Sequence, residues 1–293
     1  MTILLDRDTR IVVHGAESRS GRFQLGEMTR YGRQLAGAVP SRPGAIEPPL
    51  PVPVPVYESV AEAVKQTGAD LLLVFTPQLQ VKAVVIEAIY AGVSTVVCLT
   101  DDVPLHDAVE LRQRAERAKV ILLGPNSTGL LSPGTGKAGY YSEDVCMPGR
   151  VGVISKSGSL AYAVMSEMMS FGIGVSTISG IGGDAVRGAS FAELLPLYED
   201  DPETDAIVML GEIGGDDEER AARIIPGRMS KPVVAFISGR SVPLGQSMGH
   251  AGAIAEAGRG DYETKTKALR DAGVHVAATI GDVVGILRTL RKA

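Results

Sequence analysis

Aromatic residues and cysteine are both scarce in this sequence of 293 residues. There is no Trp, aromatic residues make up 4% of the chain, and the two cysteines are Cys98 and Cys146. Two cysteines are too few for a disulfide framework, and their spacing is not that of a metal site. Because few aromatic side chains are present for bases to stack on, the composition argues against a nucleic-acid-binding surface.

Long runs of one charge and long apolar runs are missing as well. The chain carries 29 basic and 34 acidic residues, a formal net charge of −5, with no long run of either sign. No segment approaches the roughly 20 apolar residues that a membrane span needs, and the N-terminus lacks the features of a signal peptide. We therefore expect a cytoplasmic protein that binds neither nucleic acid nor membrane.

Apolar residues are abundant, at 45% of the chain, and they form short β-rich runs that alternate with amphipathic segments. Such alternation is typical of parallel strands joined by crossover helices. In the first half, the predicted strands are Ile11–His14, Leu71–Phe75, Thr95–Leu99 and Val120–Leu123, and the helices are Ser59–Thr67, Gln78–Tyr90 and Leu105–Ala118. In the second half, the predicted strands are Val151–Ile154, Val175–Ile178, Ile207–Leu210, Val233–Ile237 and Val274–Ala277, and the helices are Ser159–Ser170, Ser190–Glu199, Asp216–Ile225, Tyr262–Ala272 and Asp282–Arg291.

The pattern lapses from Gly124 to Gly149 into Gly, Pro, Ser and Tyr, which indicates a connection between domains. The chain length also suits two domains. The predicted fold class is α/β, with two tandem doubly wound domains over residues 1–124 and 150–293 and a connection over residues 125–149. Sheets of this kind bind ligands at the carboxyl ends of their strands.

Three local signals refine this prediction. The run Pro48–Pro55 cannot donate a regular ladder of hydrogen bonds, so we expect an extended connection there. Ser190 with Glu193 predicts a capping box. The acidic run Asp216–Glu219 places negative charge where a helix dipole favours it.

The loop Gly15–Phe23 follows the first predicted strand and opens a helix, where α/β folds bind phosphate groups on backbone N–H groups. No G-x-G-x-x-G fingerprint can be read there, which disfavours a nicotinamide-dependent oxidoreductase. We expect a phosphate-bearing ligand other than NAD, with Arg19, Arg22 or Arg42 as counter-charges. An ordinary βα turn explains this loop about equally well.

The loop Ser155–Ser159 combines three hydroxyls and a glycine with a helix N-terminus, which suits a phosphoryl group or a carboxylate. Glycine-rich turns, Gly180–Asp184 and Gly211–Gly215, follow two further strands. The segment Gly134–Lys137 is not a P-loop, because Leu131 and the residue after Lys137 are not the Gly and Ser/Thr required. If the protein uses ATP, a different chain is expected to hold it.

His250 lies within Ser247–Ile254, among Gly and Ala residues that leave its ring open to whatever faces the loop. A ring nitrogen could there act as a nucleophile, a base or a ligand, and a solvated turn histidine is the simpler alternative. Glu212 stands at the carboxyl end of a predicted strand. Its carboxylate could accept a hydrogen bond from one ring nitrogen and leave the other free to attack.

The chain resembles the α subunit of succinate–CoA ligase, the ADP- or GDP-forming acid–thiol ligase of the citric-acid cycle, in a family that includes part of ATP-citrate lyase. The resemblance extends over essentially the whole chain with the motifs in the same order. Its most specific blocks are Gly180–Asp184, Gly211–Gly215, Lys231–Val234 and Met248–Ile254.

This resemblance implies a Rossmann-like coenzyme A-binding domain followed by a flavodoxin-like ligase domain. His250 would be transiently phosphorylated and Glu212 would orient it. The residues expected to contact coenzyme A are Gly15, Ser18, Arg19, Ser20, Gly21, Arg42, Leu99, Thr100 and Asp101. Those expected near the substrate or phosphate are Ser155, Ser157, Gly158, Ser159, Tyr162, Asn126, Gly182 and Gly183. No metal site is expected in this chain.

The resemblance also implies an ATP-grasp β subunit, in a heterodimer or heterotetramer, that holds ATP or GTP with magnesium. A short carboxylic acid would be activated as an acyl phosphate before coenzyme A attacks it. Ser18, the segment Ser41–Pro43 and the segment Gly124–Gly129 depart from the family pattern. Malate, sulfoacetate or another short acid is therefore an alternative to succinate, and a non-catalytic coenzyme A-binding regulator is a further alternative.

Overall fold

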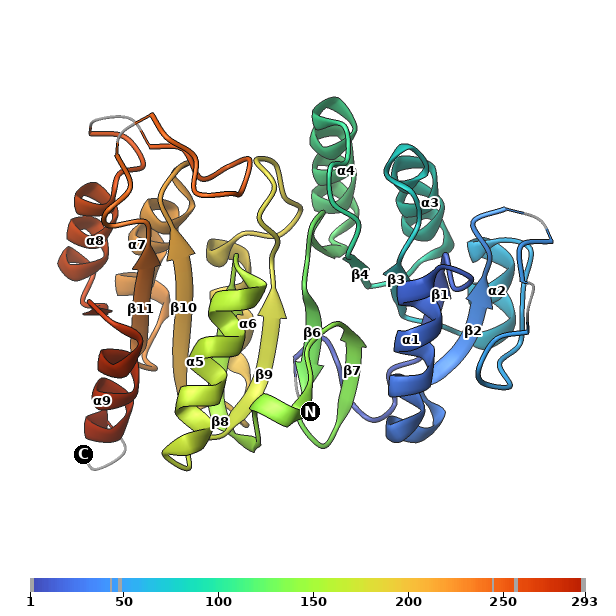
Figure 1. The fold of residues 1–293 in the computed structure, drawn as a ribbon, viewed down its shortest axis with the longest axis horizontal. Coiled ribbons are helices and arrows are strands. Elements are labelled where there is room, and N and C mark those ends of the chain that lie inside the picture. Colours follow the sequence, from blue (N-terminus) through green and yellow to red (C-terminus); the bar gives the residue numbers. More distant parts are fainter. Residues whose placement is uncertain (1–2, 43, 47–48, 244, 256–257, 291–293) are drawn as a thin grey trace. The chain divides into compact units, whose positions relative to one another are not determined.

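The computed structural model describes residues 3–42, 44–46, 49–243, 245–255 and 258–290, which form two units (Figure 1). The first unit comprises Leu4–Tyr141 together with Val186–Ala189. The second contains Ser142–Ala185 and the chain from Ser190 onward. Among the helices of this described part, none has the length and apolar character needed to cross a bilayer.

Short parallel strands form the sheet of the first unit, in the order β2-β1-β3-β4-β5. Such apolar strands need cover on both faces. Helices α2, α3 and α4 pack side by side on one face, and α1 covers the other (Figure 1). The strands are β1 Ile11–His14, β2 Leu35–Val39, β3 Leu71–Val74, β4 Thr95–Cys98 and β5 Ile121–Leu123, and the helices are α1 Arg19–Met28, η1 Thr29–Gln34, α2 Val60–Thr67, α3 Gln78–Ala91 and α4 Leu105–Ala118.

A single bridge extends this sheet beyond β2. Val56 pairs in parallel with Ala38, and the Ala38 N–H donates to the Pro55 carbonyl at 2.9 Å. With Val56 as the third strand, the order becomes the 3-2-1-4-5-6 of the Rossmann fold, which agrees with the predicted fold class. Proline removes the N–H donors on which a longer ladder depends, so the pairing stays at the sheet edge. The predicted extended run starts at Pro48, which lies outside the described residues.

The stretch over residues 125–149, predicted to be a connection, contains regular structure. Strands β6 (Gly129–Ser132) and β7 (Gly136–Gly139) form an antiparallel hairpin, and the short helix η2 (Glu143–Val145) follows. The two strands approach so closely that a Cβ added at Gly139 would lie 2.6 Å from the Gly129 Cα. Glycine at these positions hid the strand pattern in the sequence. The division between the two units falls after Tyr141, within this stretch.

In the second unit, parallel strands run in the order β12-β11-β10-β8-β9. Counted along the chain this is the 2-1-3-4-5 order of flavodoxin, as predicted. Helices α5 and α9 pack together on one face, and α6, α7 and α8 pack in turn on the other (Figure 1). The strands are β8 Pro148–Ser155, β9 Val175–Gly180, β10 Ala206–Glu212, β11 Val233–Ser238 and β12 His275–Ala277, and the helices are α5 Gly158–Ser170, α6 Phe191–Asp200, α7 Asp217–Arg228, α8 Tyr262–Asp271 and α9 Ile280–Leu290. The last helix was predicted to end at Arg291, which lies outside the described residues.

Local capping explains where several helices begin. The predicted capping box is present: the Ser190 hydroxyl accepts from the Glu193 N–H at 3.3 Å, and the Glu193 carboxylate accepts from the Ser190 N–H at 2.8 Å. Helix α1 begins after Ser18, whose hydroxyl accepts from the Gly21 N–H at 3.0 Å. The acidic residues at the start of α7 do more than complement the helix dipole, because Glu218 is completely buried and forms ion pairs with Lys156 and Lys265.

Candidate active site

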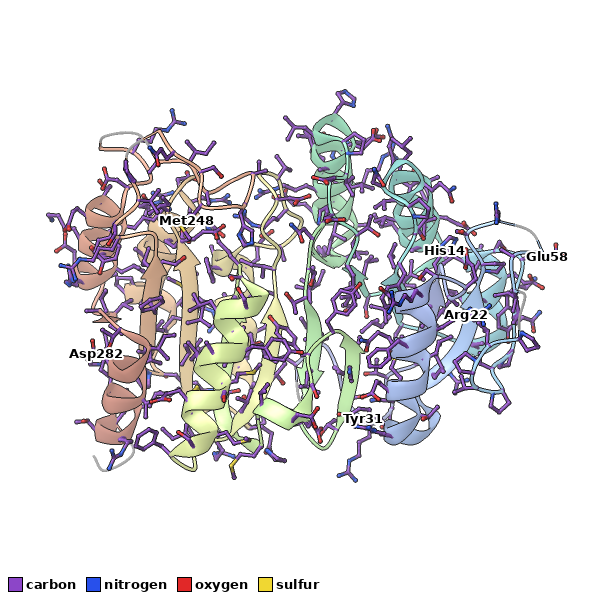
Figure 2. The ribbon with its side chains drawn as sticks, in the orientation of Figure 1. His14, Arg22, Tyr31, Glu58, Met248 and Asp282 are labelled. Carbon is purple, nitrogen blue, oxygen red and sulfur yellow. The ribbon has the colours of Figure 1, made fainter. Side chains whose placement is uncertain are left out.

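A cavity of about 390 Å³ lies where the sheet of the second unit changes its winding direction, between β8 and β10. The carboxyl ends of these strands and of β11 open into it, as expected for an open α/β sheet. Met248, labelled in Figure 2, belongs to its wall. The lining residues are Ser157, Ser159, Leu160, Glu212, Ser238, Met248 and His250.

His250 and Glu212 form a hydrogen-bonded pair in this cavity. His250 Nδ1 lies 2.7 Å from Glu212 Oε2, with the Glu212 side chain 2% exposed and the His250 side chain 30% exposed. A carboxylate oxygen accepts hydrogen bonds, so Nδ1 is the ring nitrogen that donates to Glu212, and in the neutral ring the lone pair is then on Nε2. The pair thus fixes one ring nitrogen of a partly exposed imidazole.

The loop that carries His250 is a narrow hairpin in which Ser247 bridges Ile254 in antiparallel fashion. Two glycine-rich turns close on it. A Cβ at Gly183 would lie 2.7 Å from the imidazole ring, and a Cβ at Gly214 would lie 2.0 Å from a carbonyl oxygen of the hairpin. Glycine is required at both positions because the backbone and ring approach so closely.

The Ser155–Ser159 loop forms another wall of the cavity. Ser157 caps α5 by accepting from the Leu160 N–H at 3.3 Å, and its hydroxyl lies 3.3 Å from that of Ser159. Ser155 is buried beneath them and donates to the Ser157 carbonyl at 2.7 Å. The Ser157 and Ser159 hydroxyls therefore face the cavity beside the positive end of the α5 dipole, an arrangement suited to an anion.

The structure places the other residues predicted for substrate or phosphate less uniformly. Gly158 is the first residue of α5, and Gly182 adopts a φ of +95° next to Gly183. Tyr162 packs toward η2 instead of lining the cavity, and burial raises the pKa of its phenol. Asn126 belongs to the first unit. A role for Tyr162 or Asn126 in substrate binding stays a prediction.

A second cavity, of about 370 Å³, lies at the carboxyl ends of β1, β3 and β4 in the first unit. It is lined by six of the residues predicted to contact coenzyme A: Ser18, Arg19, Ser20, Leu99, Thr100 and Asp101. Gly15 and Gly21 shape the loop instead. A Cβ at Gly15, where φ is +76°, would lie 2.8 Å from the Phe75 backbone, and a Cβ at Gly21 would lie 2.7 Å from the Gly15 carbonyl oxygen.

The three predicted counter-charges have different surroundings. Arg19 lines this cavity, whereas Arg42 is exposed and does not. Arg22 on α1 (Figure 2) donates to the carbonyls of Glu17 and Pro49, at 3.0 and 2.9 Å. Arg19 is thus the predicted arginine placed to meet a ligand in this cavity.

Sequence reasoning missed four lining residues, Phe75, Thr76, Pro77 and Tyr140, whereas Glu17 lies in the predicted Gly15–Phe23 loop and Ser41 in the segment that departs from the family pattern. Glu17 joins the first loop to the segment after β2, because its carboxylate accepts from the Ser41 N–H at 3.0 Å. Phe75 and Tyr140 meet edge to face, with ring centroids 6.0 Å apart. Phe75 ends a predicted strand, and Thr76 and Pro77 follow it, so the rule that found Leu99–Asp101 would have found this segment.

His14 is the last residue of β1 (Figure 2). The side chain is buried, and Nδ1 lies 2.5 Å from the Thr76 hydroxyl that lines the cavity. Burial, only partly offset by Glu17, lowers the pKa of His14 to about 4. The ring is therefore neutral near pH 7 and positions Thr76 as an uncharged partner.

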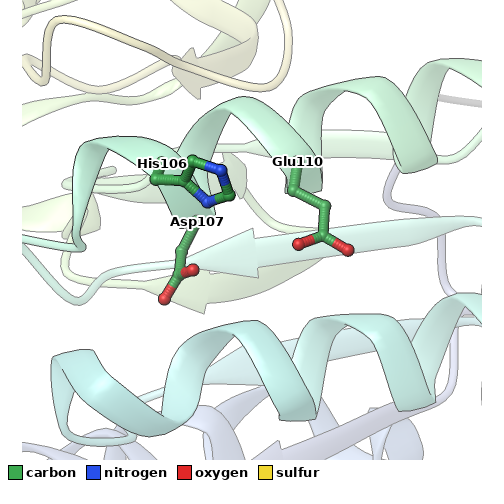
Figure 3. A group of neighbouring side chains, drawn as sticks. All are labelled: His106, Asp107 and Glu110. Carbon is green, nitrogen blue, oxygen red and sulfur yellow. The ribbon is translucent and has the colours of Figure 1, made fainter.

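On α4, His106, Asp107 and Glu110 bring together donor atoms that could hold a metal ion (Figure 3). Lys82 Nζ lies 3.0 Å from Asp107 and 2.7 Å from Glu110, so both carboxylates already have a cationic partner. An incoming cation would have to displace this lysine. We interpret the group as surface ion pairs and assign no metal to it.

Comparisons with known proteins agree with this geometry. A CoA-binding-domain model matches residues 6–101, and a CoA-ligase model matches residues 154–275. The chain is 43% identical to the succinate–CoA ligase [ADP-forming] subunit alpha 1 of Archaeoglobus fulgidus over 98% of each chain. It is 39% identical to the ADP-forming sulfoacetate–CoA ligase subunit SauD of Bilophila wadsworthia over 99% of each.

A solved structure shows the same fold. The ATP citrate lyase of Methanothrix soehngenii, in complex with citrate and coenzyme A, superposes with a TM-score of 0.85 at 22% identity, over 99% of this chain and 52% of that one. The chain thus spans about half of that protein, and at this identity the likeness concerns the fold alone.

The two sheets and the two matched models define a two-domain α/β protein with a coenzyme A-binding domain followed by a CoA-ligase domain. The chain belongs to the succinate–CoA ligase alpha-subunit family, the alpha subunits of ADP-forming acid–thiol ligases, as its motifs predicted.

Proposed function

We propose that this chain is the catalytic alpha subunit of an acid–CoA ligase in which His250 carries the phosphoryl group. The observation that carries the proposal is the 2.7 Å hydrogen bond between His250 Nδ1 and Glu212, within a cavity that Ser157 and Ser159 also line. A phosphohistidine carrier needs a nucleophilic ring nitrogen beside fixed donors for an anion, and both are present here.

In the proposed reaction, the Nε2 lone pair of His250 attacks the terminal phosphorus of ATP, and the bond to ADP breaks. A carboxylate oxygen of the acid then takes the phosphoryl group as an acyl phosphate, and Nε2 recovers its lone pair. The coenzyme A sulfur attacks the acyl carbon, the thiol loses its proton, and phosphate leaves. Glu212 stabilises the charged ring, and the Ser157 and Ser159 hydroxyls stabilise the transferring phosphoryl group without reorganising.

Coenzyme A is proposed to bind in the cavity of the first unit. Arg19 supplies a cation for its phosphates, and Thr76 and Thr100 supply hydroxyls. Phe75 and Tyr140 supply apolar surface for its base or its thiol-bearing arm. In this scheme residues 1–124 bind coenzyme A together with Tyr140 of the stretch over residues 125–149, and residues 150–293 carry the phosphohistidine chemistry.

The nucleotide is proposed to bind on a partner chain. Gly134–Lys137 lies in and before β7 of the hairpin, not between a strand and a helix, so it lacks the context of a P-loop. ATP or GTP with magnesium would sit on an ATP-grasp β subunit, in a heterodimer or heterotetramer in the cytoplasm.

The acid would be a short carboxylate. Succinate and sulfoacetate are the leading candidates, since relatives named for each are 43% and 39% identical.

The test uses the full chain with its cognate β subunit and ATP labelled in the terminal phosphate. We expect acid-labile, base-stable label on this chain, and ADP release with coenzyme A and one acid from a panel of succinate, malate and sulfoacetate. His250→Asn should abolish labelling and lower turnover by about a thousandfold or more. His106→Asn, which alters an exposed histidine on α4, is the matched control and should preserve both. Normal labelling in His250→Asn would show that the proposal is wrong.

A further inference from the structure

A buried group of charged side chains, Lys156, Glu218 and Lys265, lies beside the Glu212 main chain and has no part in the proposed reaction. Glu218 and Lys265 are fully buried, and the Lys156 side chain is 2% exposed. Removing an ion from water costs several kcal/mol unless close partners compensate it. Three ions gathered beside a reactive histidine therefore call for an explanation beyond core packing.

Glu218 uses both of its carboxylate oxygens. Oε1 lies 2.7 Å from Lys156 Nζ and accepts from the Glu212 N–H at 3.1 Å, while Oε2 lies 2.5 Å from Lys265 Nζ. The pairing between β8 and β10 ends at Ser155 and Leu210. Beyond that point, the Glu218 carboxylate takes the place of a β8 carbonyl as the acceptor for the Glu212 N–H. A Cβ at Gly211 would lie 2.5 Å from Oε1, so glycine there makes room for the carboxylate.

The two lysines connect the Glu218 carboxylate to the loops that surround the cavity of the second unit. Lys156 lies between Ser155 and Ser157 in the sequence, and its Nζ lies over the Phe191 ring, 5.5 Å from the ring centroid. Lys265 on α8 also donates to the Gly215 carbonyl at 3.0 Å. The Gly211–Gly215 loop is thus fixed at two points, and the serine loop is joined to the same carboxylate.

The carboxylate of Glu218 is ionised near neutral pH. Burial alone would raise the pKa of Glu218, but the ammonium groups of Lys156 and Lys265 outweigh it and hold the pKa at about 2. The Glu212 N–H therefore bonds to a full negative charge, which makes a stronger hydrogen bond than a neutral acceptor would.

We propose that Glu218 is a positioning residue for His250. By holding the Glu212 main chain, it keeps the Glu212 carboxylate 2.7 Å from Nδ1 and so selects the tautomer that carries its hydrogen on Nδ1. This inference rests on the proposed function, because orientation matters to the reaction only if His250 reacts. Misplacement of a reacting group by about 1 Å can cost roughly a hundredfold in rate.

The test compares Glu218→Gln with Glu219→Gln. Glu219 also contacts Lys265, at 2.9 Å, so its variant removes a carboxylate from the same lysine without removing the acceptor of the Glu212 N–H. The first readout is the ¹⁵N NMR of the neutral His250 ring in the free chain. We expect hydrogen on Nδ1 in the unsubstituted chain and in Glu219→Gln, and a mixture of tautomers in Glu218→Gln.

The second readout is turnover with the β subunit, ATP, coenzyme A and acid. Glu218→Gln should lower kcat about 10- to 100-fold and leave the KM for coenzyme A unchanged, because that ligand is proposed to bind in the first unit. A wild-type tautomer and wild-type kcat in Glu218→Gln would overturn the positioning role. Absence of phosphoryl on His250 of the unsubstituted chain would instead overturn the proposed function and leave the tautomer result standing.

Gly211→Ala is a second variant that displaces Glu218 without changing any charge, and it should produce the same mixture of tautomers. Circular dichroism establishes that each variant is folded. If neither folds, hydrogen exchange in the unsubstituted chain decides. The Glu212 amide should exchange as slowly as those of the β10 ladder, and exchange as fast as an exposed amide would overturn the proposal.

Discussion

His250 is held by two neighbours of different kinds. Glu212 fixes one ring nitrogen through a hydrogen bond, and Gly183 packs against the ring so closely that a Cβ there would lie 2.7 Å from three of its atoms. The first contact sets the tautomer and the second limits where the ring can lie. The position of the His250 ring therefore depends on the absence of a Cβ at Gly183.

Gly183→Ala tests this packing. The added methyl group should push the ring away from Glu212 and lower the rate of His250 phosphorylation about 10- to 100-fold. Gly183 does not adopt a positive φ, so alanine should bring no backbone strain. Gly227→Ala in α7 is the control, because a Cβ there meets nothing within 4 Å. Label incorporation at the wild-type rate in Gly183→Ala would mean that the loop simply moves aside.

His14 makes folding depend on pH. Burial lowers its pKa to about 4, whereas the unfolded chain has the ordinary value of 6.5. Between these values the unfolded state binds more protons, so the free energy of unfolding falls as the pH drops through this window, by up to about 3 kcal/mol. His14→Gln should remove this part of the dependence.

The measurement is urea unfolding at about pH 7 and about pH 4.5. His275→Gln changes an exposed histidine on β12 and should show the same dependence as the unsubstituted chain. If His14→Gln and the unsubstituted chain lose stability in parallel, the ring of His14 is protonated in the folded state.

At the scale of elements, strands with β-branched residues were predictable and strands of small residues were not. β3 and β4 consist of Leu, Val, Thr and Cys and were recognised, whereas β2 (Leu35–Val39) contains Gly and Ala and was missed. The reason for its glycine is tertiary: a Cβ at Gly37 would lie 2.7 Å from the Tyr57 ring. No local pattern contains that contact.

In the site, too, residues marked by a local pattern were predictable and those defined by tertiary contacts were not. Ser157 and Glu212 each follow a predicted strand, so the rule for carboxyl ends of strands predicted two residues that line one cavity. Glu218 looked like a charge that complements a helix dipole, and its role as the acceptor for Glu212 became visible only when α8 supplied Lys265. Glu218 and Lys265 are far apart in the sequence, so no motif spacing predicts their contact.

The capping box of α6 gives a prediction for one element. Ser190→Ala removes the hydroxyl that accepts from the Glu193 N–H and should lower the free energy of unfolding by about 1 kcal/mol. Urea unfolding measures the change. Ser170→Ala, at the exposed end of α5, should change stability by less than about 0.5 kcal/mol. An equal effect of both substitutions would show that the cap contributes nothing specific.

For the whole molecule, each unit has its own set of parallel strands and its own cavity. His250 and Glu212 lie in the second unit, and Arg19 lies in the first. If coenzyme A binds the first cavity and phosphate the second, single substitutions should separate thioester formation from phosphorylation. A protein with one composite ligand site would not allow this separation.

Arg19→Gln tests the division. Loss of one charge-assisted hydrogen bond costs about 1.5–3 kcal/mol, so the Kd for coenzyme A should rise roughly 10- to 150-fold in calorimetric titration of the full chain. Labelling of His250 by ATP and the β subunit should be unchanged. His250→Asn should show the converse, with normal coenzyme A affinity and no label. Arg117→Gln, an exposed arginine on α4 outside the cavity lining, should change neither quantity. Loss of labelling in Arg19→Gln would mean that the two cavities do not act separately.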